Sequence, residues 1–217
     1  MASEIPRAEL DRLKKLWAYE EELYSRGLAS VAGVDEAGRG PLAGPVAAAC
    51  VMLPRGAMIP GVNDSKKLSA KKRLEISRVI KETAVCYRVE TVDAETIDKI
   101  NILNATYLAM RRAVAGLTVS PGVVLVDGRE ITGADFSQIA IVGGDSKIFS
   151  IAAASVLAKV YRDELMIAYD ELYPAYGFAK HKGYGTAAHI EALKEYGPCP
   201  IHRRSFIKKF IAGGGSI

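Results

Sequence analysis

The sequence predicts an α/β domain built on a mixed β-sheet. Short, continuously apolar segments bounded by glycine and proline are typical of buried strands. Longer segments with apolar residues at helical spacing follow them in the second half of the chain. An initial meander followed by alternating strands and helices is typical of this class. With 217 residues, the chain can bury a core without help from a disulfide or a structural metal.

The expected elements follow one another with short connections. In chain order they are a helix at 6–26, strands at 31–35 and 46–53, a helix at 69–81, a strand at 85–89, a helix at 93–115, strands at 123–126 and 138–142, and helices at 147–172 and 187–196. Ser69 and Thr186 are expected N-caps, because their hydroxyls can accept hydrogen bonds from free amides of the first helical turn. Pro174 is expected to stop the longest helix.

Three regions are expected along the chain. Residues 1–28 form an N-terminal helical extension packed on the outside, residues 29–210 form the main domain with C-terminal helices, and residues 211–217 form a flexible, glycine-rich tail. Neither an internal repeat nor a low-complexity linker divides the chain further.

Composition points to an ordinary globular protein with a mild basic excess. Hydrophobic residues make up 49% of the chain and the net charge is +4. Basic residues cluster near 66–73, 180–182 and 202–209, which suits a phosphate-bearing partner, although composition alone favours solvated surface faces as the explanation. Three widely spaced cysteines and the lack of any long apolar stretch predict a reduced, cytoplasmic protein without a membrane segment.

The main functional clue is the position of four acids. Asp35 ends one expected buried strand, Asp127 ends a second, and Asp145 follows a third. Ligands of open α/β sheets gather at the carboxyl ends of strands, so these acids can converge. Glu36 joins them only if the strand breaks after Asp35, since neighbouring strand residues point to opposite faces. We expect the glycine-rich segment that follows to supply this break.

Taken one at a time, each acid has a structural explanation. An Asp at a strand end often forms a local turn, and Asp145 before a helix can be an N-cap. Four clustered carboxylates would repel one another, and hard divalent cations with oxygen ligands, Mg²⁺ or Mn²⁺, relieve that repulsion. Two such ions about 4 Å apart are the usual arrangement for cleaving a phosphodiester. His181, His189 and His202 lack the spacing of a zinc protease.

The segment Gly38-Arg39-Gly40-Pro41-Leu42-Ala43-Gly44 fits neither common nucleotide-binding motif. Its glycine spacing departs from the dinucleotide fingerprint, it leads into a strand, and no Gly-Lys-Ser/Thr follows it. It can serve as a tight turn, or it can bring bare backbone close to a nucleic-acid sugar or phosphate.

The string V-D-E-A-G-R-G-P-L-A-G-P-V at residues 34–46 resembles bacterial ribonuclease HII, the type 2 ribonuclease H. Further blocks resemble the same family in family order, at residues 63–68, 126–128, 144–160 and 181–206. The resemblance implies the ribonuclease H-like fold, with a central five-stranded mixed sheet flanked by helices.

The same resemblance implies an activity. It is endonucleolytic hydrolysis of the RNA strand of RNA–DNA hybrids, including the 5′ side of single ribonucleotides embedded in duplex DNA, leaving 5′-phosphate and 3′-hydroxyl ends. A monomer with one or two Mg²⁺ or Mn²⁺ ions, the second arriving with substrate, is implied, as is a part in ribonucleotide excision repair and DNA replication. The alternatives are a ribonuclease HIII-like enzyme and an inert hybrid-binding protein on the same fold.

By similarity, nine residues acquire roles. The resemblance makes Asp35, Glu36, Asp127 and Asp145 the catalytic, metal-binding carboxylates, assigns Gly38, Arg39 and Gly40 to the ribose 2′-hydroxyl, Lys66 to a phosphate, and Tyr184 to the sugar after the cut. Lys67 can replace Lys66 in this role. An aromatic ring at Tyr184 favours a deoxyribose, while the glycine-rich segment requires a ribose upstream, so the pair would select an RNA-to-DNA junction.

Overall fold

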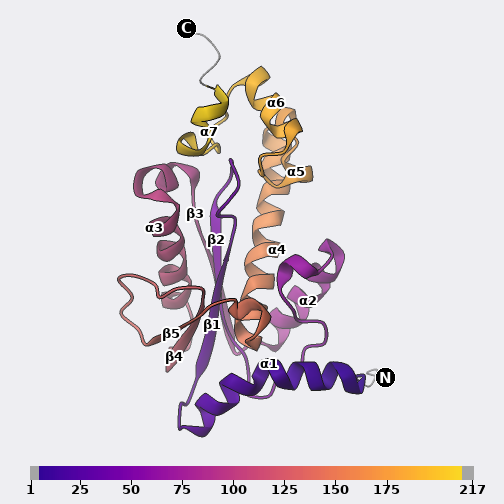
Figure 1. The fold of residues 1–217 in the computed structure, drawn as a ribbon, viewed down its shortest axis with the longest axis vertical. Helices are drawn as coiled ribbons and strands as arrows, with labels where there is room; N and C mark the ends of the chain where they lie inside the picture. The colour runs from indigo at the N-terminus through magenta and orange to yellow at the C-terminus, as the bar shows by residue number, and fades with distance from the viewer. Residues whose placement is uncertain (1–4, 212–217) are drawn as a thin grey trace.

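The computed structural model describes residues 5–211, which form a five-stranded sheet with helices on both faces (Figure 1). The strands are β1 (Val31–Ala37), β2 (Val46–Met52), β3 (Cys86–Val92), β4 (Val123–Asp127) and β5 (Gln138–Ile141). The α-helices are α1 (Arg7–Ser25), α2 (Ala70–Thr83), α3 (Ala94–Ala115), α4 (Phe149–Leu172), α5 (Phe178–His181), α6 (Ala187–Tyr196) and α7 (Arg204–Ile211). The short 3₁₀-helices are η1 (Ser65–Lys67), η2 (Gly144–Ser146) and η3 (Pro174–Tyr176).

The sheet has the strand order β3-β2-β1-β4-β5. The first three strands form an antiparallel meander, and β4 and β5 then run parallel to β1. The predicted mixed sheet of five strands is therefore confirmed. Parallel neighbours such as β1 and β4 bring their carboxyl ends to one edge, where loops can supply a site.

Helix α3 covers one face of the sheet, and α4 covers the other together with α1 and α2 (Figure 1). The small helices α5 and α6 pack beside the C-terminal half of α4, and α7 packs against α6 and α3 (Figure 1). Both faces of β2 are buried along its whole length, which explains why this strand is continuously apolar in sequence.

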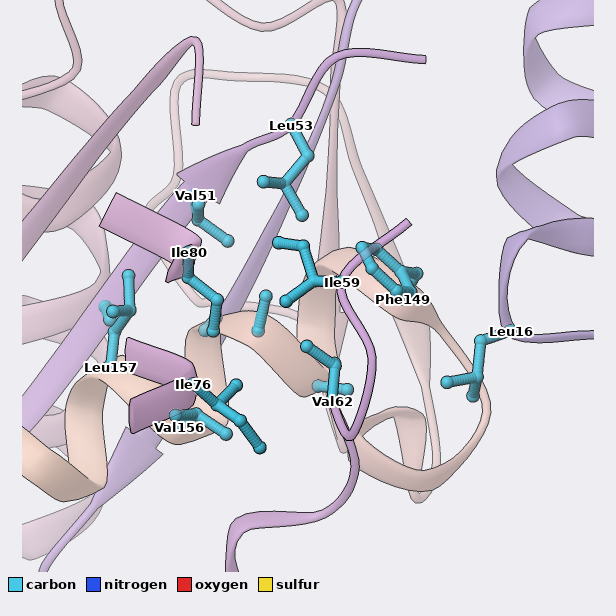
Figure 2. Packing of buried hydrophobic residues seen from close by; sticks show 14 of the residues in the cluster. Leu16, Val51, Leu53, Ile59, Val62, Ile76, Ile80, Phe149, Val156 and Leu157 are labelled. Carbon is cyan, nitrogen blue, oxygen red and sulfur yellow. The ribbon is translucent and has the colours of Figure 1, made fainter. Parts of the chain in front are cut away.

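The core between the sheet and α4 combines residues of four elements with the connection that follows β2 (Figure 2). Leu16 of α1, Val51 of β2, Ile80 of α2 and Leu157 of α4 belong to the same buried cluster. Trp17 stacks on Phe149 with ring centroids 5.0 Å apart. The buried side chains of α1 therefore belong to this core. The packing on the outside that was expected of an N-terminal extension holds only for the exposed side of the helix.

Glu20 links α1 to the beginning of α4. Its side chain is 1% exposed and accepts a hydrogen bond of 3.2 Å from the backbone N–H of Ser150. Ile148, at the N-cap position of α4, offers no capping side chain, so Glu20 caps this helix from another element. Burial raises the pKa of Glu20 to about 7.

The expected helix caps are confirmed. Ser69 accepts from the N–H of Lys72, and Thr186 accepts from the N–H of His189. Among the described residues, no helix is long and apolar enough to cross a membrane. Cys50, Cys86 and Cys199 are free thiols, all buried.

The helix expected at 93–115 is interrupted, which the sequence pattern did not indicate. Asn101 has φ 64° and ψ 165°, and its side chain accepts from the N–H of Asn104, as an N-cap would. The helix therefore restarts after Asn101. Ile97 before the break and Tyr107 after it are both buried in the core beside the sheet, whereas Leu103 is 40% exposed. Helix α7 was expected only as part of a helical C-terminal region, and the expected tail lies outside the described residues except for Ile211, which ends α7.

Glu20→Gln should make the protein more stable at neutral and alkaline pH. The folded-state pKa of Glu20, about 7, is above its ordinary value of 4.5, so its stabilising effect is complete below about pH 4.5 and is lost as the pH rises through 7. Glutamine stays neutral and avoids this loss. We expect Tm to exceed that of the wild type at pH 8 and to match it more closely at pH 5. The exposed Glu22→Gln is the control on the same helix. A Tm difference that does not change with pH would contradict the role of Glu20.

Candidate active site

Neighbouring parallel strands place Asp35 and Asp127 side by side. Val34 of β1 is in register with Val126 of β4, so the residues that follow them are at the same level. Val34 and Val126 pack toward α3 in one core cluster. Because strand residues alternate between faces, Asp35 and Asp127 project toward the opposite face, which α4 covers.

Asp145 reaches the same place from the turn before α4. It lies in η2, and β4 is tied to η2 by a 2.6 Å hydrogen bond from the N–H of Gly144 to Oδ1 of Asp127. One carboxylate oxygen from each of Asp35, Asp127 and Asp145 lies within 4.8 Å of the others. Asp35 and Asp145 are 4% and 7% exposed. The structure thus brings together three of the four predicted carboxylates, which we call the acid cluster.

The electrostatics of the acid cluster fit a divalent cation. Burial, together with the charges of Glu36 and Asp127, raises the pKa of Asp35 well above its usual range. Burial and the nearby Asp145 raise the pKa of Asp127. Three carboxylates that converge in a poorly solvated place are a donor set suited to Mg²⁺ or Mn²⁺.

Glu36 lies on the other face of β1, and the predicted break in the strand is wrong. Pairing with β2 continues through Asp35↔Ala49, Glu36↔Ala48 and Ala37↔Ala47. Glu36 therefore faces a cleft of about 420 Å³ beside α3, where Arg39 and Asp127 also line the wall. Nη1 of Arg39 is 3.3 Å from Oε1 of Glu36. Asp127 borders both this cleft and the acid cluster, so the two faces meet at the end of β4.

Lys66 extends toward the acid cluster. Its Nζ lies 3.4 Å from Oδ2 of Asp145, although the side chain is 79% exposed. The hydroxyl of Ser65 hydrogen-bonds that of Ser155 at 2.9 Å, which ties η1 to α4. No comparable contact between Lys67 and an acid exists within residues 5–211. The geometry therefore favours Lys66 over Lys67 as the cation at the cluster.

The glycine-rich segment and Tyr184 form the neighbouring surface. Gly38 is buried with φ +95°, whereas Arg39 and Gly40 are exposed. A Cβ atom added at Gly40 would lie 3.9 Å from the Tyr184 ring, which is ordinary contact. Tyr184 is 44% exposed and offers a ring face next to bare backbone.

A pair of histidines with no predicted role, His189 and His202, supports the loop of Tyr184. Nδ1 of His189 lies 2.9 Å from the carbonyl oxygen of Tyr184, and the two Nε2 atoms of His189 and His202 are 3.1 Å apart. The N–H of Cys199 donates to Nδ1 of His202. Because Nδ1 of His202 accepts, its Nε2–H donates to Nε2 of His189. His189 then carries its proton on Nδ1 and donates it to the carbonyl oxygen of Tyr184. Burial lowers both pKa values, that of His202 to about 4, so the pair is neutral at pH 7.

Two buried arginines were also missed. Arg162 and Arg203 are both 0% exposed and donate to backbone carbonyls around the glycine-rich segment. In the sequence, Arg162 belongs to the helix expected at 147–172 and Arg203 to the basic cluster at 202–209, and a sequence pattern does not distinguish a buried cation from an exposed one.

The chain resembles known proteins both in sequence and in fold. The family model described as Ribonuclease HII matches residues 32–209. A Ribonuclease HII from Caldanaerobacter subterraneus subsp. tengcongensis is 54% identical over 205 residues, covering 94% of this chain and 85% of the relative. The ribonuclease H2 structure from Pyrococcus horikoshii has a TM-score of 0.72 at 27% identity, covering 84% of this chain and 97% of that one.

The PCNA:RNase HII complex from Archaeoglobus fulgidus is a further similar structure. Its TM-score is 0.69 at 28% identity, with coverage of 81% of this chain and 93% of that one. These two structures and the matched relatives confirm the predicted ribonuclease H-like fold, and they favour ribonuclease HII over the HIII alternative.

Asp35→Asn should raise the stability of the metal-free protein. The raised pKa of Asp35 means that ionising it costs folding free energy as the pH increases, so the wild type loses stability there and the variant does not. In EDTA at pH 8 we expect a higher Tm for Asp35→Asn. Saturating Mg²⁺ or Mn²⁺ should raise the wild-type Tm much more than that of the variant. Equal metal-induced shifts in both proteins would contradict a cation site at Asp35.

Proposed function

The chain belongs to the ribonuclease HII family and is a metal-dependent endoribonuclease, and we propose that the acid cluster cuts RNA within RNA–DNA hybrids and on the 5′ side of single ribonucleotides in duplex DNA. The observation that carries this proposal is the convergence of Asp35, Asp127 and Asp145 from three separate segments. The products would be a 5′-phosphate and a 3′-hydroxyl.

Asp35, Asp127 and Asp145 would hold one divalent cation, and Glu36 with Asp127 would hold a second when substrate is bound. Bound Mg²⁺ or Mn²⁺ supplies activation of the attacking water and stabilisation of the departing oxygen. Glu36 and Asp35 face opposite sides of β1, and Asp127 is shared between the two sides. This arrangement supports two separate ion positions with a common ligand.

Lys66 and the surrounding backbone would orient the nucleic acid. The exposed Nζ of Lys66 near Asp145 can contact a phosphate, and partly neutralises the acid cluster until cations bind. The ring of Tyr184 would pack on the deoxyribose that follows the cut, where a 2′-hydroxyl would be crowded. The backbone of residues 38–40 would contact the ribose 2′-hydroxyl on the other side of the cut.

A duplex with one embedded ribonucleotide provides the direct test. The wild type should cut it on the 5′ side in Mg²⁺ or Mn²⁺, and EDTA should abolish cleavage. Asp35→Asn and Asp145→Asn should each reduce the rate by about a thousandfold or more, since loss of a metal ligand removes several kcal/mol of transition-state stabilisation. Binding of the duplex, measured by fluorescence anisotropy, should change little.

The control for these variants is Asp11→Asn, an exposed carboxylate of α1, which should cut at the wild-type rate. Normal turnover by Asp35→Asn, or cleavage that persists in EDTA, would refute the proposed site.

Tyr184→Ala tests the selection of the junction. We expect its rate on the embedded ribonucleotide to fall about tenfold more than its rate on an all-RNA hybrid strand, because the ring contact with the deoxyribose is lost and about 1.4 kcal/mol corresponds to tenfold in rate. Tyr184→Phe keeps the ring and should keep the preference. Equal losses on both substrates would indicate a packing role for Tyr184.

A further inference from the structure

Arg203 and Arg162 are the two largest fully buried side chains, and neither has a carboxylate partner among the described residues. Burying an unpaired cation costs several kcal/mol unless hydrogen bonds compensate. Burial and the charge of Arg162 lower the pKa of Arg203 to about 9, so its guanidinium is still charged at pH 7. Such a costly arrangement is expected where the buried cations hold a backbone segment that has no regular secondary structure of its own.

Both guanidiniums donate to the backbone of the glycine-rich segment. Arg203 donates to the carbonyl oxygens of Gly38 at 2.6 Å and Arg39 at 2.9 Å, and through Nε to that of Gly44 at 2.9 Å. Arg162 donates to the carbonyl oxygens of Ala43, Pro45 and Lys182. The two arginines thus hold five carbonyls within residues 38–45.

Two glycines of this segment lie directly against the buried side chains of Arg162 and Met166. A Cβ at Gly38 would lie 2.0 Å from Nε of Arg162, and one at Gly44 would lie 2.3 Å from Sδ of Met166. Both glycines also have positive φ, of +95° and +84°. The backbone therefore rests directly on buried side chains at Gly38 and Gly44, where a larger residue would not fit.

The direction of these carbonyls determines the direction of the amides. In a planar trans peptide the C=O and the following N–H point in opposite directions. Because the carbonyls of Gly38 and Arg39 point inward to Arg203, the N–H groups of Arg39 and Gly40 point outward. Neither amide donates to another group in the described part of the chain. The two free N–H donors therefore belong to peptide groups whose carbonyl oxygens bind the charged guanidinium of Arg203.

We infer that Arg203, assisted by Arg162, is a positioning residue that turns the amides of Arg39 and Gly40 toward the substrate ribose and so sets the preference for ribose over deoxyribose. This inference rests on the proposed function, since it assigns the ribose contact to residues 38–40. Arg162 also fixes the carbonyl of Lys182, two residues before Tyr184. The backbone of residues 38–45 and the loop of Tyr184, which together would select the junction, are therefore both held by Arg162.

The key variant is Arg203→Lys, which keeps the charge and loses the planar fork that reaches three carbonyls. Arg204→Lys is the matched control, because Arg204 is the next residue and is exposed. In Ca²⁺, which prevents turnover, we expect Arg203→Lys to lower the affinity ratio between a duplex with one ribonucleotide and the all-DNA duplex by about tenfold, since misaligned donors lose much of their effect. Arg204→Lys should keep the wild-type ratio.

A readout on the backbone separates positioning from general destabilisation. In ¹⁵N-labelled protein, the amide signals of Arg39 and Gly40 should move in Arg203→Lys and stay in place in Arg204→Lys. In the wild type, the same two signals should shift on adding the ribonucleotide duplex and much less on adding all-DNA. Metal-induced stabilisation should persist in Arg203→Lys, which shows that the acid cluster is intact.

An unchanged affinity ratio in a folded Arg203→Lys protein would overturn the inference. If Arg203→Lys does not fold, the wild-type signals of Arg39 and Gly40 decide, and their failure to respond to the ribonucleotide duplex overturns it equally. A wild type that binds the duplex with these shifts but does not cut it would refute the proposed function and leave the positioning role supported.

Discussion

Direct contact between the backbones of β1 and α4 is the constraint on which the site depends. A Cβ at Gly33 would lie 2.3 Å from the carbonyl carbon of Ser150, so the strand and the helix touch with no side chain between them. The alanines of α4, buried at positions 152–154, allow the same close approach farther along. This contact brings Asp35, two residues after Gly33, up to Ser155 of α4 and to Asp145 in the turn before the helix. Any larger residue at position 33 would separate these groups and open the acid cluster.

The fold holds the acid cluster together against its own repulsion. Burial raises the pKa values of Asp35 and Asp127, which means that their ionised forms destabilise the metal-free protein. The sheet and the hydrogen bond from the N–H of Gly144 to Asp127 supply the opposing stabilisation. Cation binding should therefore stabilise the folded protein strongly, because the ions remove the repulsion between carboxylates that folding brings together.

The substrate side of the site is built from backbone, supported by buried cations and neutral histidines. Arg162 and Arg203 hold the carbonyls of residues 38–45, while the pair His189–His202 holds the carbonyl of Tyr184. The contact between Ala43 and His202 joins the two supports. Selection of a sugar by one hydroxyl requires donors placed to a few tenths of an ångström, and a rigid backbone on buried supports meets this need better than long exposed side chains.

The order of strands and helices, the caps at Ser69 and Thr186, and the presence of acids at strand ends could all be determined from the sequence, because each depends on local periodicity or on neighbouring residues. The motifs also indicated the family and the four carboxylates. Only the tertiary structure decided that β1 continues through Glu36 and places it on the far face from Asp35, since strand pairing with β2 is a long-range property. It also decided the break at Asn101 and the burial of Arg162 and Arg203. Whether a cation is solvated or holds a loop depends on what packs around it, and residues far apart in the chain determine that packing.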